Sequence, residues 1–160
     1  YGVFYIRLSR KKAEQIYMSG STFEIGKANT LREGSDATII ASGICVADAC
    51  RVADKLADEG IHVRVLDMFT IKPIDKEAII KASKETGAIV TVENHNIMNG
   101  LGSAVSEVLS EEAPCRMKRL GAPDCFGEVG TVPFLKEKYH MAEKDIEEAV
   151  KSLVCKKDVA

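Results

Sequence analysis

The sequence predicts an α/β fold in which helices cover both faces of a mostly parallel sheet. Short apolar runs alternate along the chain with segments whose apolar residues recur at helical spacing. Glycines and prolines separate most of these segments, as they do at the ends of strands and helices. Of the 160 residues, 46% are hydrophobic and 29% are charged, which is typical of one globular domain with at most a short appendage.

The individual elements follow from apolar spacing and from the residues that break it. We expect an edge strand over residues 23–31, interrupted by Gly26, followed by a turn at residues 33–36. The remaining elements alternate. They are a strand over 37–42, a helix over 44–59 that stops at Gly60, a strand over 63–68, a helix from Pro73 and Asp75 to Gly87, a strand over 88–92, a helix over 101–111, a strand over 116–120, and two closing helices over 132–139 and 143–154.

The chain opens with an apolar run, residues 2–6, that predicts a buried strand because both alternating faces are apolar. A natural protein rarely begins inside a core strand. We therefore expect the chain to be a piece of a larger protein, or a subunit recorded without its first residues. Residues 9–26 are mixed and polar, with a flexible step at Ser19-Gly20-Ser21, and they indicate a linker.

Charge and hydropathy argue against several classes of protein. No apolar run reaches the length of a membrane span, and the basic residues follow the opening run instead of preceding it as in a signal peptide. We therefore expect a cytoplasmic protein. The net charge is −2, and the largest basic block is Arg10-Lys11-Lys12, so nucleic-acid binding is not expected.

The chain has five cysteines, at positions 45, 50, 115, 125 and 155. Their number is odd and no pair has Cys-x-x-Cys spacing, so neither a disulfide framework nor a zinc site is indicated. We expect reduced thiols that serve as small apolar residues.

Residues 93–102 are the most unusual of the turns that should lie at the carboxyl ends of the strands. Gly100-Leu101-Gly102 matches the first two glycines of a dinucleotide-binding loop, but Val105 stands where a small residue is needed. Glu93 and His95 are two residues apart and could form an acid/base pair. The competing interpretations are a tight turn that leads into a helix, for the glycines, and a polar loop facing a partner subunit, for Glu93 and His95.

Motifs of a complete catalytic apparatus are absent from the sequence. It contains no phosphate loop, no nucleophile elbow, no Gly-Asp-Gly that could begin a thiamine-diphosphate and magnesium site, and no carboxylates at metal-ligand spacing. Arg7 and Arg10 end the opening run three residues apart and could hold a phosphate through paired hydrogen bonds. The simpler interpretation makes them solvated charges beside Lys11 and Lys12.

Several segments together carry a family resemblance. VRVLDMFTIKPIDKEAII (63–80) and IVTVENHNIMNGLGSAVSEVL (89–109) are similar to two parts of the transketolase C-terminal domain. GVFYIRLSR (2–10) resembles the last strand of the pyrimidine-binding domain that precedes it in transketolases. Residues 23–43 and 140–146 also fit.

The resemblance implies a three-layer α/β/α domain with a five-stranded, mostly parallel sheet and one antiparallel edge strand. It divides the chain in two. Residues 1–22 would be the last strand of the preceding domain plus a linker, and residues 23–160 would be the transketolase C-terminal domain.

The resemblance also implies a function. Transketolases transfer a two-carbon ketol unit between sugar phosphates, as in the pentose phosphate pathway, using thiamine diphosphate and a divalent ion such as Mg²⁺. Both cofactors would sit in domains that are absent here, so this chain alone is expected to bind neither and to be inactive. Its partners would be an N-terminal transketolase section, in a homodimer or a heterotetramer, and sugar phosphate substrates.

One site residue is implied. The family's arginine in a Ser-Arg pair contacts the sugar phosphate and matches Ser9-Arg10, which makes Arg10 the expected substrate-binding residue. No catalytic, cofactor-binding or metal-binding residue is expected in this chain. Asn94 and Asn99 depart from the family pattern, in which an acidic residue and a glycine are frequent at these positions.

Alternatives within and beyond this family stay open. 1-deoxy-xylulose-5-phosphate synthase shares the domain, but it typically has Pro-Arg-Gly where Ser9-Arg10-Lys11 stands. In the beta subunits of 2-oxo acid dehydrogenases the same domain would act as a module that binds a partner core protein. A free nucleotide-binding regulatory domain that uses the Gly100 turn is a further alternative.

Overall fold

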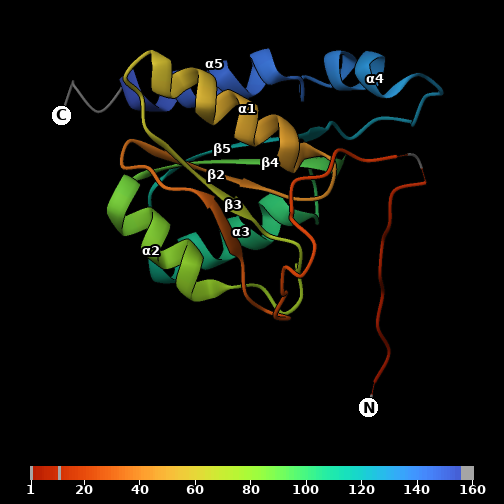
Figure 1. The fold of residues 1–160 in the computed structure, drawn as a ribbon, viewed down its shortest axis with the longest axis horizontal. Coiled ribbons are helices and arrows are strands. Elements are labelled where there is room, and N and C mark those ends of the chain that lie inside the picture. Colours follow the sequence, from red (N-terminus) through yellow and green to blue (C-terminus); the bar gives the residue numbers. More distant parts are fainter. Residues whose placement is uncertain (1, 11, 156–160) are drawn as a thin grey trace.

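A computed structural model describes residues 2–10 and 12–155 of the chain. It contains one five-stranded sheet in the order β1-β3-β2-β4-β5, with helices on both faces (Figure 1). The strands are β1 (Asn29–Arg32), β2 (Ala37–Ala41), β3 (Val63–Asp67), β4 (Ala88–Asn96) and β5 (Arg116–Ala122). The helices are α1 (Cys45–Asp58), α2 (Lys76–Thr86), α3 (Leu101–Glu112), α4 (Val132–Lys138) and α5 (Glu143–Val154).

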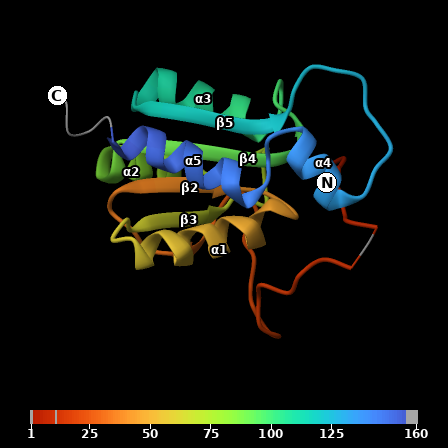
Figure 2. The same ribbon diagram turned by 90° about the horizontal axis from the view of Figure 1, so that it is seen from above.

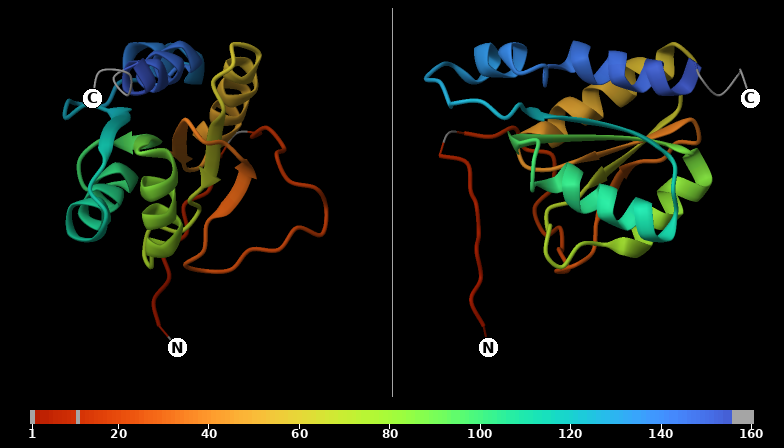
Figure 3. Two further views of the ribbon diagram at one scale, coloured as in Figure 1. Left: turned by 90° about the vertical axis from the view of Figure 1, so that its left-hand side faces the viewer. Right: turned by 180° about the vertical axis from the view of Figure 1, so that it is seen from behind.

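Three layers make up the domain, as Figure 1 and the end-on view in Figure 3 show, and Figure 2 looks down on α1 and α5 with the sheet behind them. Helices α1 and α5 cover one face of the sheet, and α2 and α3 cover the other. Each interface holds its own cluster of buried aliphatic side chains, with Ile39 and Leu56 in the first and Ile40 and Leu101 in the second. Burial of these two clusters is the main force that stabilises the fold.

Strand pairing confirms the predicted fold class. The pairs β2–β3, β2–β4 and β4–β5 are parallel, whereas β1 pairs antiparallel with β3 at the sheet edge. The edge strand is shorter than the predicted range of 23–31, because the chain turns before it. The backbone N–H of Lys27 donates to the carbonyl of Glu24 at 3.1 Å, and Gly26 has a positive φ of 85°.

Local sequence signals set the ends of helix α2. The side chain of Asp75 accepts a hydrogen bond from the backbone N–H of Ala78 at 3.0 Å, which caps the first turn. Gly87 ends the helix in the left-handed conformation, with φ 62°, and its N–H donates to the carbonyl of Ser83. The predicted limits of this helix are therefore confirmed almost residue for residue.

Strand β4 is longer than predicted. Its last four residues, 93–96, were expected to belong to a loop, but they continue the strand. These residues are polar, so the sequence did not indicate that the strand continues. The extension forms because β5 also continues to Ala122, which pairs with Asn96. Gly121 allows the close approach, because a Cβ there would lie 3.1 Å from the carbonyl oxygen of His95.

The prediction of a buried strand at residues 2–6 is wrong for this chain. Residues 2–9 belong to no strand or helix, their side chains are exposed, and the N-terminal end of the segment extends away from the domain (Figures 1 and 3). Val3, for example, is fully exposed. A strand needs a neighbour for its backbone N–H and C=O groups, and the described part of the chain provides none for this segment.

Candidate functional site

Ligands of open parallel sheets bind outside the carboxyl ends of the strands, where neighbouring strands send their helices to opposite faces. Here that point lies between β2 and β4, because α1 follows β2 on one face and α3 follows β4 on the other. Gly43 lies two residues beyond β2, and Asn94 lies near the end of β4. The two strand ends are in contact, since a Cβ on Gly43 would lie 3.2 Å from the Asn94 side-chain oxygen.

Glu93 occupies the start of helix α3. Its carboxylate is 2% exposed and accepts hydrogen bonds from the backbone N–H groups of Leu101 and Gly102, each at 2.7 Å. These are two of the donors that a helix N-terminus leaves unpaired, and a negative charge is favourable there. Glu93 therefore fills the anion-binding position of this helix with a group of its own chain.

The two glycines of this turn are required by the same contacts. A Cβ on Gly100 would lie 2.0 Å from a Glu93 carboxylate oxygen, and one on Gly102 would lie 2.9 Å from the Thr91 hydroxyl. Both positions exclude larger residues, because the turn packs directly on β4. The structure thus supports the tight-turn interpretation over the dinucleotide-binding loop, whose N–H groups would have to be free for a phosphate.

We therefore expect neither NAD nor ATP to protect this domain against heating. A ligand that binds the folded state raises stability by about 2.7 kcal/mol at a hundredfold excess over its dissociation constant. Thermal unfolding of the chain with and without millimolar nucleotide measures this directly. A clear rise in Tm with either nucleotide would contradict the tight-turn interpretation.

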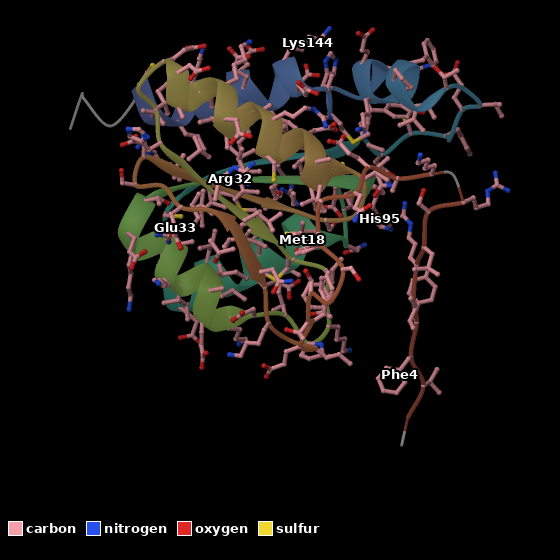
Figure 4. The ribbon with its side chains drawn as sticks, in the orientation of Figure 1. Phe4, Met18, Arg32, Glu33, His95 and Lys144 are labelled. Atoms are coloured by element: carbon pink, nitrogen blue, oxygen red, sulfur yellow. The ribbon has the colours of Figure 1, made fainter. Side chains whose placement is uncertain are left out.

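The proposed acid/base pair is not assembled for proton transfer. The Nδ1 atom of His95 lies 3.8 Å from Glu93 Oε2 and only 2.8 Å from the carbonyl oxygen of Asn96. Both carboxylate oxygens of Glu93 already accept hydrogen bonds from N–H groups of α3. Glu93 therefore has a structural role here and does not act as a base. The alternative in which this polar stretch faces a partner subunit stays a prediction; His95 is half-exposed (Figure 4).

The two candidate phosphate-binding arginines differ in their surroundings. The Nη2 atom of Arg7 donates to the main-chain carbonyl of Asn94 at 2.6 Å, so the N-terminal segment lies against the end of β4. Arg10, three residues further on, has an exposed side chain. Lys11, which the simpler interpretation placed beside it, lies outside the described residues. The role of Arg10 in substrate binding stays a prediction.

The sequence-based predictions did not include a partly buried polar cluster near the end of β3. The Tyr17 hydroxyl donates to Asp67 Oδ2 at 2.7 Å and accepts from the side-chain amide of Asn29 at 3.2 Å. Burial raises the pKa of the Asp67 carboxyl, and burial together with the hydrogen bond to Asp67 raises the pKa of Tyr17. No sequence signal marks this contact, because Tyr17 and Asp67 are 50 positions apart.

The cysteines do not form a reactive or cross-linked site. All five are free. Cys45 is fully buried, and burial raises the pKa of its thiol to about 12, so the thiolate is not populated at neutral pH. Cys45 and Cys50 are buried, as predicted for small apolar residues, whereas Cys125 and Cys155 are exposed.

Thiamine diphosphate and a divalent ion do not fit the residues that the structure describes. Within residues 2–10 and 12–155, no group of three or more His, Cys, Asp or Glu side chains could hold a metal ion. The N–H groups at the start of α3, which could hold a diphosphate, are bound to Glu93. In the same part of the chain, no helix has the length and apolar character needed to cross a membrane.

Comparison with known proteins decides the family. The sequence model described as "Transketolase, C-terminal domain" matches residues 26–146, well over half of the chain. This chain belongs to the transketolase C-terminal domain family. The sequence-based resemblance is thereby confirmed.

Individual relatives extend this family assignment. Over 157 residues the chain is 45% identical to the 6-deoxy-6-sulfo-D-fructose transketolase subunit of Clostridium sp. (strain MSTE9), covering 98% of the chain and 49% of that relative. Over 134 residues it is 42% identical to the 1-deoxy-D-xylulose-5-phosphate synthase of Heliobacterium modesticaldum, covering 83% of the chain and 21% of the synthase.

A solved structure gives the same result for the fold. It is a split-gene transketolase, described as an inactive beta4 tetramer, and it matches with a TM-score of 0.87 at 42% sequence identity. The match covers 91% of this chain and 48% of that chain. The chain therefore spans about half the length of this structure and of the transketolase subunit, and about a fifth of the synthase.

Proposed function

We propose that this chain is the C-terminal part of a thiamine-diphosphate-dependent transketolase. It supports subunit assembly, and it contributes to the reversible transfer of a two-carbon ketol unit between sugar phosphates. The observation that carries this proposal is the match to a transketolase subunit across 98% of the chain. A match of that extent includes the segment with Arg10, which the family model, beginning at residue 26, does not cover.

The cofactor chemistry belongs to domains outside this chain. In transketolases thiamine diphosphate, held with Mg²⁺, supplies the carbanion that carries the ketol unit. The described residues fit neither group, so no step of this reaction is assigned to them. Their proposed contribution is to bind the sugar phosphate through Arg10 and to hold the subunits together.

The N-terminal segment is the proposed link to the preceding domain. Residues 1–22 would provide that domain's last strand and the linker, and residues 23–160 would form the C-terminal domain. Exposed apolar side chains in the segment, Val3, Phe4, Ile6 and Leu8, support this division because they have no core in the described chain to enter. They would be buried when the segment joins a second sheet.

The proposed partner is an N-terminal transketolase section, in a homodimer or a heterotetramer. The similar split-gene structure supports this, because it is an inactive tetramer of beta chains alone. The predicted cytoplasmic location and the pentose phosphate pathway remain predictions from the sequence.

A second candidate function is that of 1-deoxy-xylulose-5-phosphate synthase. The 42% identity to such an enzyme favours it, although that match covers less of the chain than the transketolase subunit does. The discriminating experiment combines the chain with the thiamine-diphosphate-binding domains of the same organism and follows products. Ketol transfer from a ketose phosphate to an aldose phosphate supports the proposal, and formation of 1-deoxy-xylulose 5-phosphate instead would overturn it.

The chain alone should not bind thiamine diphosphate, even with magnesium present. Titration calorimetry of the isolated chain with both components is expected to show no heat of binding above dilution. The reason is the absence of a suitable donor set in the described residues and the occupation of the α3 N-terminus by Glu93. A dissociation constant in the micromolar range, about −8 kcal/mol of binding free energy, would contradict this prediction.

A further inference from the structure

We infer that this domain clamps the segment carrying Arg10 at two points and thereby positions Arg10 for the substrate phosphate. The first point is Arg7 on the end of β4. The second is the stretch of residues 14–17 on α1 and β3. The inference rests on the proposed function, because the role of Arg10 is part of it.

The first anchor is the Arg7 side chain. Its guanidinium donates to the Asn94 carbonyl at 2.6 Å, a short, charge-assisted hydrogen bond. Asn94 is a fixed acceptor, because β4 lies between β2 and β5 in the sheet and Glu93, its neighbour, is bound to helix α3. The N-terminal segment is otherwise exposed to solvent. Arg7 therefore attaches it to a strand that is firmly held within the domain.

The second anchor begins with an ion-pair network. Arg51 of α1 donates to Glu14 of the linker, to Glu143 at the start of α5 at 2.8 Å, and to Asp48. Asp48 is 5% exposed and also accepts from Lys136 of α4. A single exposed ion pair contributes little. Here, however, Glu143 and Asp48 already hold the Arg51 guanidinium before Glu14 adds its contact, so little further ordering of Arg51 is needed.

Contacts of Ile16 and Tyr17 complete this anchor. Ile16 is partly buried against the core cluster beneath α1 and α5. Tyr17 donates to the buried Asp67 and packs edge-to-face on Phe23, which packs in turn on Phe69, with ring centroids 4.7 and 5.2 Å apart. The linker is therefore docked on the domain at this stretch.

Tyr17 is tightly bound because its hydroxyl is the donor to the buried Asp67 carboxyl. The second oxygen of Asp67, Oδ1, is buried and has no hydrogen-bond partner in the described part of the chain. Loss of the Tyr17 hydroxyl would remove the hydrogen bond that Oδ2 accepts, which is costly for a buried carboxyl whose other oxygen already lacks a partner among the described residues. This makes Tyr17 the best point at which to release the second anchor.

The two anchors restrict the path of the chain between them. Arg10 is three residues after Arg7 and four before Glu14. Anchoring the chain on both sides of Arg10 limits the positions that Arg10 can take before any ligand arrives. A positively charged side chain held in place binds a phosphate with a smaller entropic cost than a freely moving one. Arg7 and Tyr17 are thus positioning residues that act through Arg10.

The first arm of the test measures docking of the linker directly. In this chain, Tyr17→Phe is expected to accelerate amide hydrogen exchange at residues 12–18 about tenfold or more, the effect of losing a hydrogen bond to a charged group. Glu24→Gln is the matched control, because Glu24 is an exposed residue of the same linker beyond the anchor. Equal exchange in wild type and Tyr17→Phe would overturn the inference.

The second arm measures the link to Arg10 in the assembled transketolase. Arg7→Ala and Tyr17→Phe are each expected to raise the KM for a phosphorylated ketol donor roughly three- to tenfold, with little effect on a non-phosphorylated donor. In an Arg10→Ala background, neither change should raise this KM further, because each acts through Arg10. Additive effects, or equal effects on both donors, would overturn the inference while the proposed function stands. Absence of ketol transfer in the assembled wild-type protein would overturn both.

Discussion

Replacing Arg10 with alanine in the assembled transketolase should raise the KM for phosphorylated sugars by about one to two powers of ten. A charge-assisted contact between guanidinium and phosphate in a partly desolvated site contributes roughly 1.5–3 kcal/mol. Each 1.4 kcal/mol corresponds to a tenfold change in affinity. Steady-state kinetics with a sugar phosphate and with a short, non-phosphorylated ketol donor tests this, and the second donor should hardly respond.

Two comparisons make the Arg10 result specific. Lys12→Ala removes an exposed charge from the same segment and should leave both KM values nearly unchanged. Arg7→Ala should act less on substrate affinity than Arg10→Ala, because the anchor at residues 14–17 still holds the segment. An equal loss on phosphorylated and non-phosphorylated donors would mean that Arg10 supports the fold or the subunit interface, and its assignment to the substrate would be wrong.

The largest effect on stability is expected for Glu93→Ala. This change leaves two N–H groups at the start of α3 without an acceptor in a buried site, and it removes a negative charge from a helix N-terminus. Hydrogen bonds to charged groups contribute about 1.5–3 kcal/mol each and are not additive here, so we expect a loss of roughly 3 kcal/mol. For a chain of this size the Tm should fall by about 6–12 °C.

The control for this experiment lies on the same helix. Glu107→Ala changes a carboxylate on the exposed face of α3 and should alter the free energy of unfolding by less than about 0.5 kcal/mol. Glu93→Gln should fall between wild type and Glu93→Ala, because one oxygen can still accept while the amide group opposes the other N–H. Urea denaturation followed by circular dichroism gives all three values. A Glu93→Ala chain as stable as wild type would show that Glu93 does not hold the helix.

Within the fold, the sequence determined those features that depend on neighbouring residues. Asp75 and Gly87 mark the ends of helix α2 because the capping hydrogen bonds involve residues three or four positions away. The alternation of apolar runs determined the parallel sheet in the same way, since a buried strand and a one-sided helix each have their own spacing. The resemblance to transketolases added the antiparallel edge strand, which pairing between β1 and β3 confirms.

The tertiary structure decided what depends on distant partners. The sequence predicts that Glu93 is an acidic residue of a loop. In the structure, pairing between β4 and β5 continues past Glu93, and the turn at Gly100 places the start of α3 at its carboxylate. Residues 2–6 read as a core strand, yet they are exposed because apolar composition alone does not provide a neighbouring strand.

The contacts of the N-terminal segment and the linker also depend on partners that are distant in the sequence. Arg7 meets Asn94 across 87 positions, and Tyr17 meets Asp67 across 50. Neither side chain has a local spacing that could reveal its partner. Such contacts form only after the sheet has brought the ends of β3 and β4 to one edge, because a hydrogen bond depends on distance and direction in space.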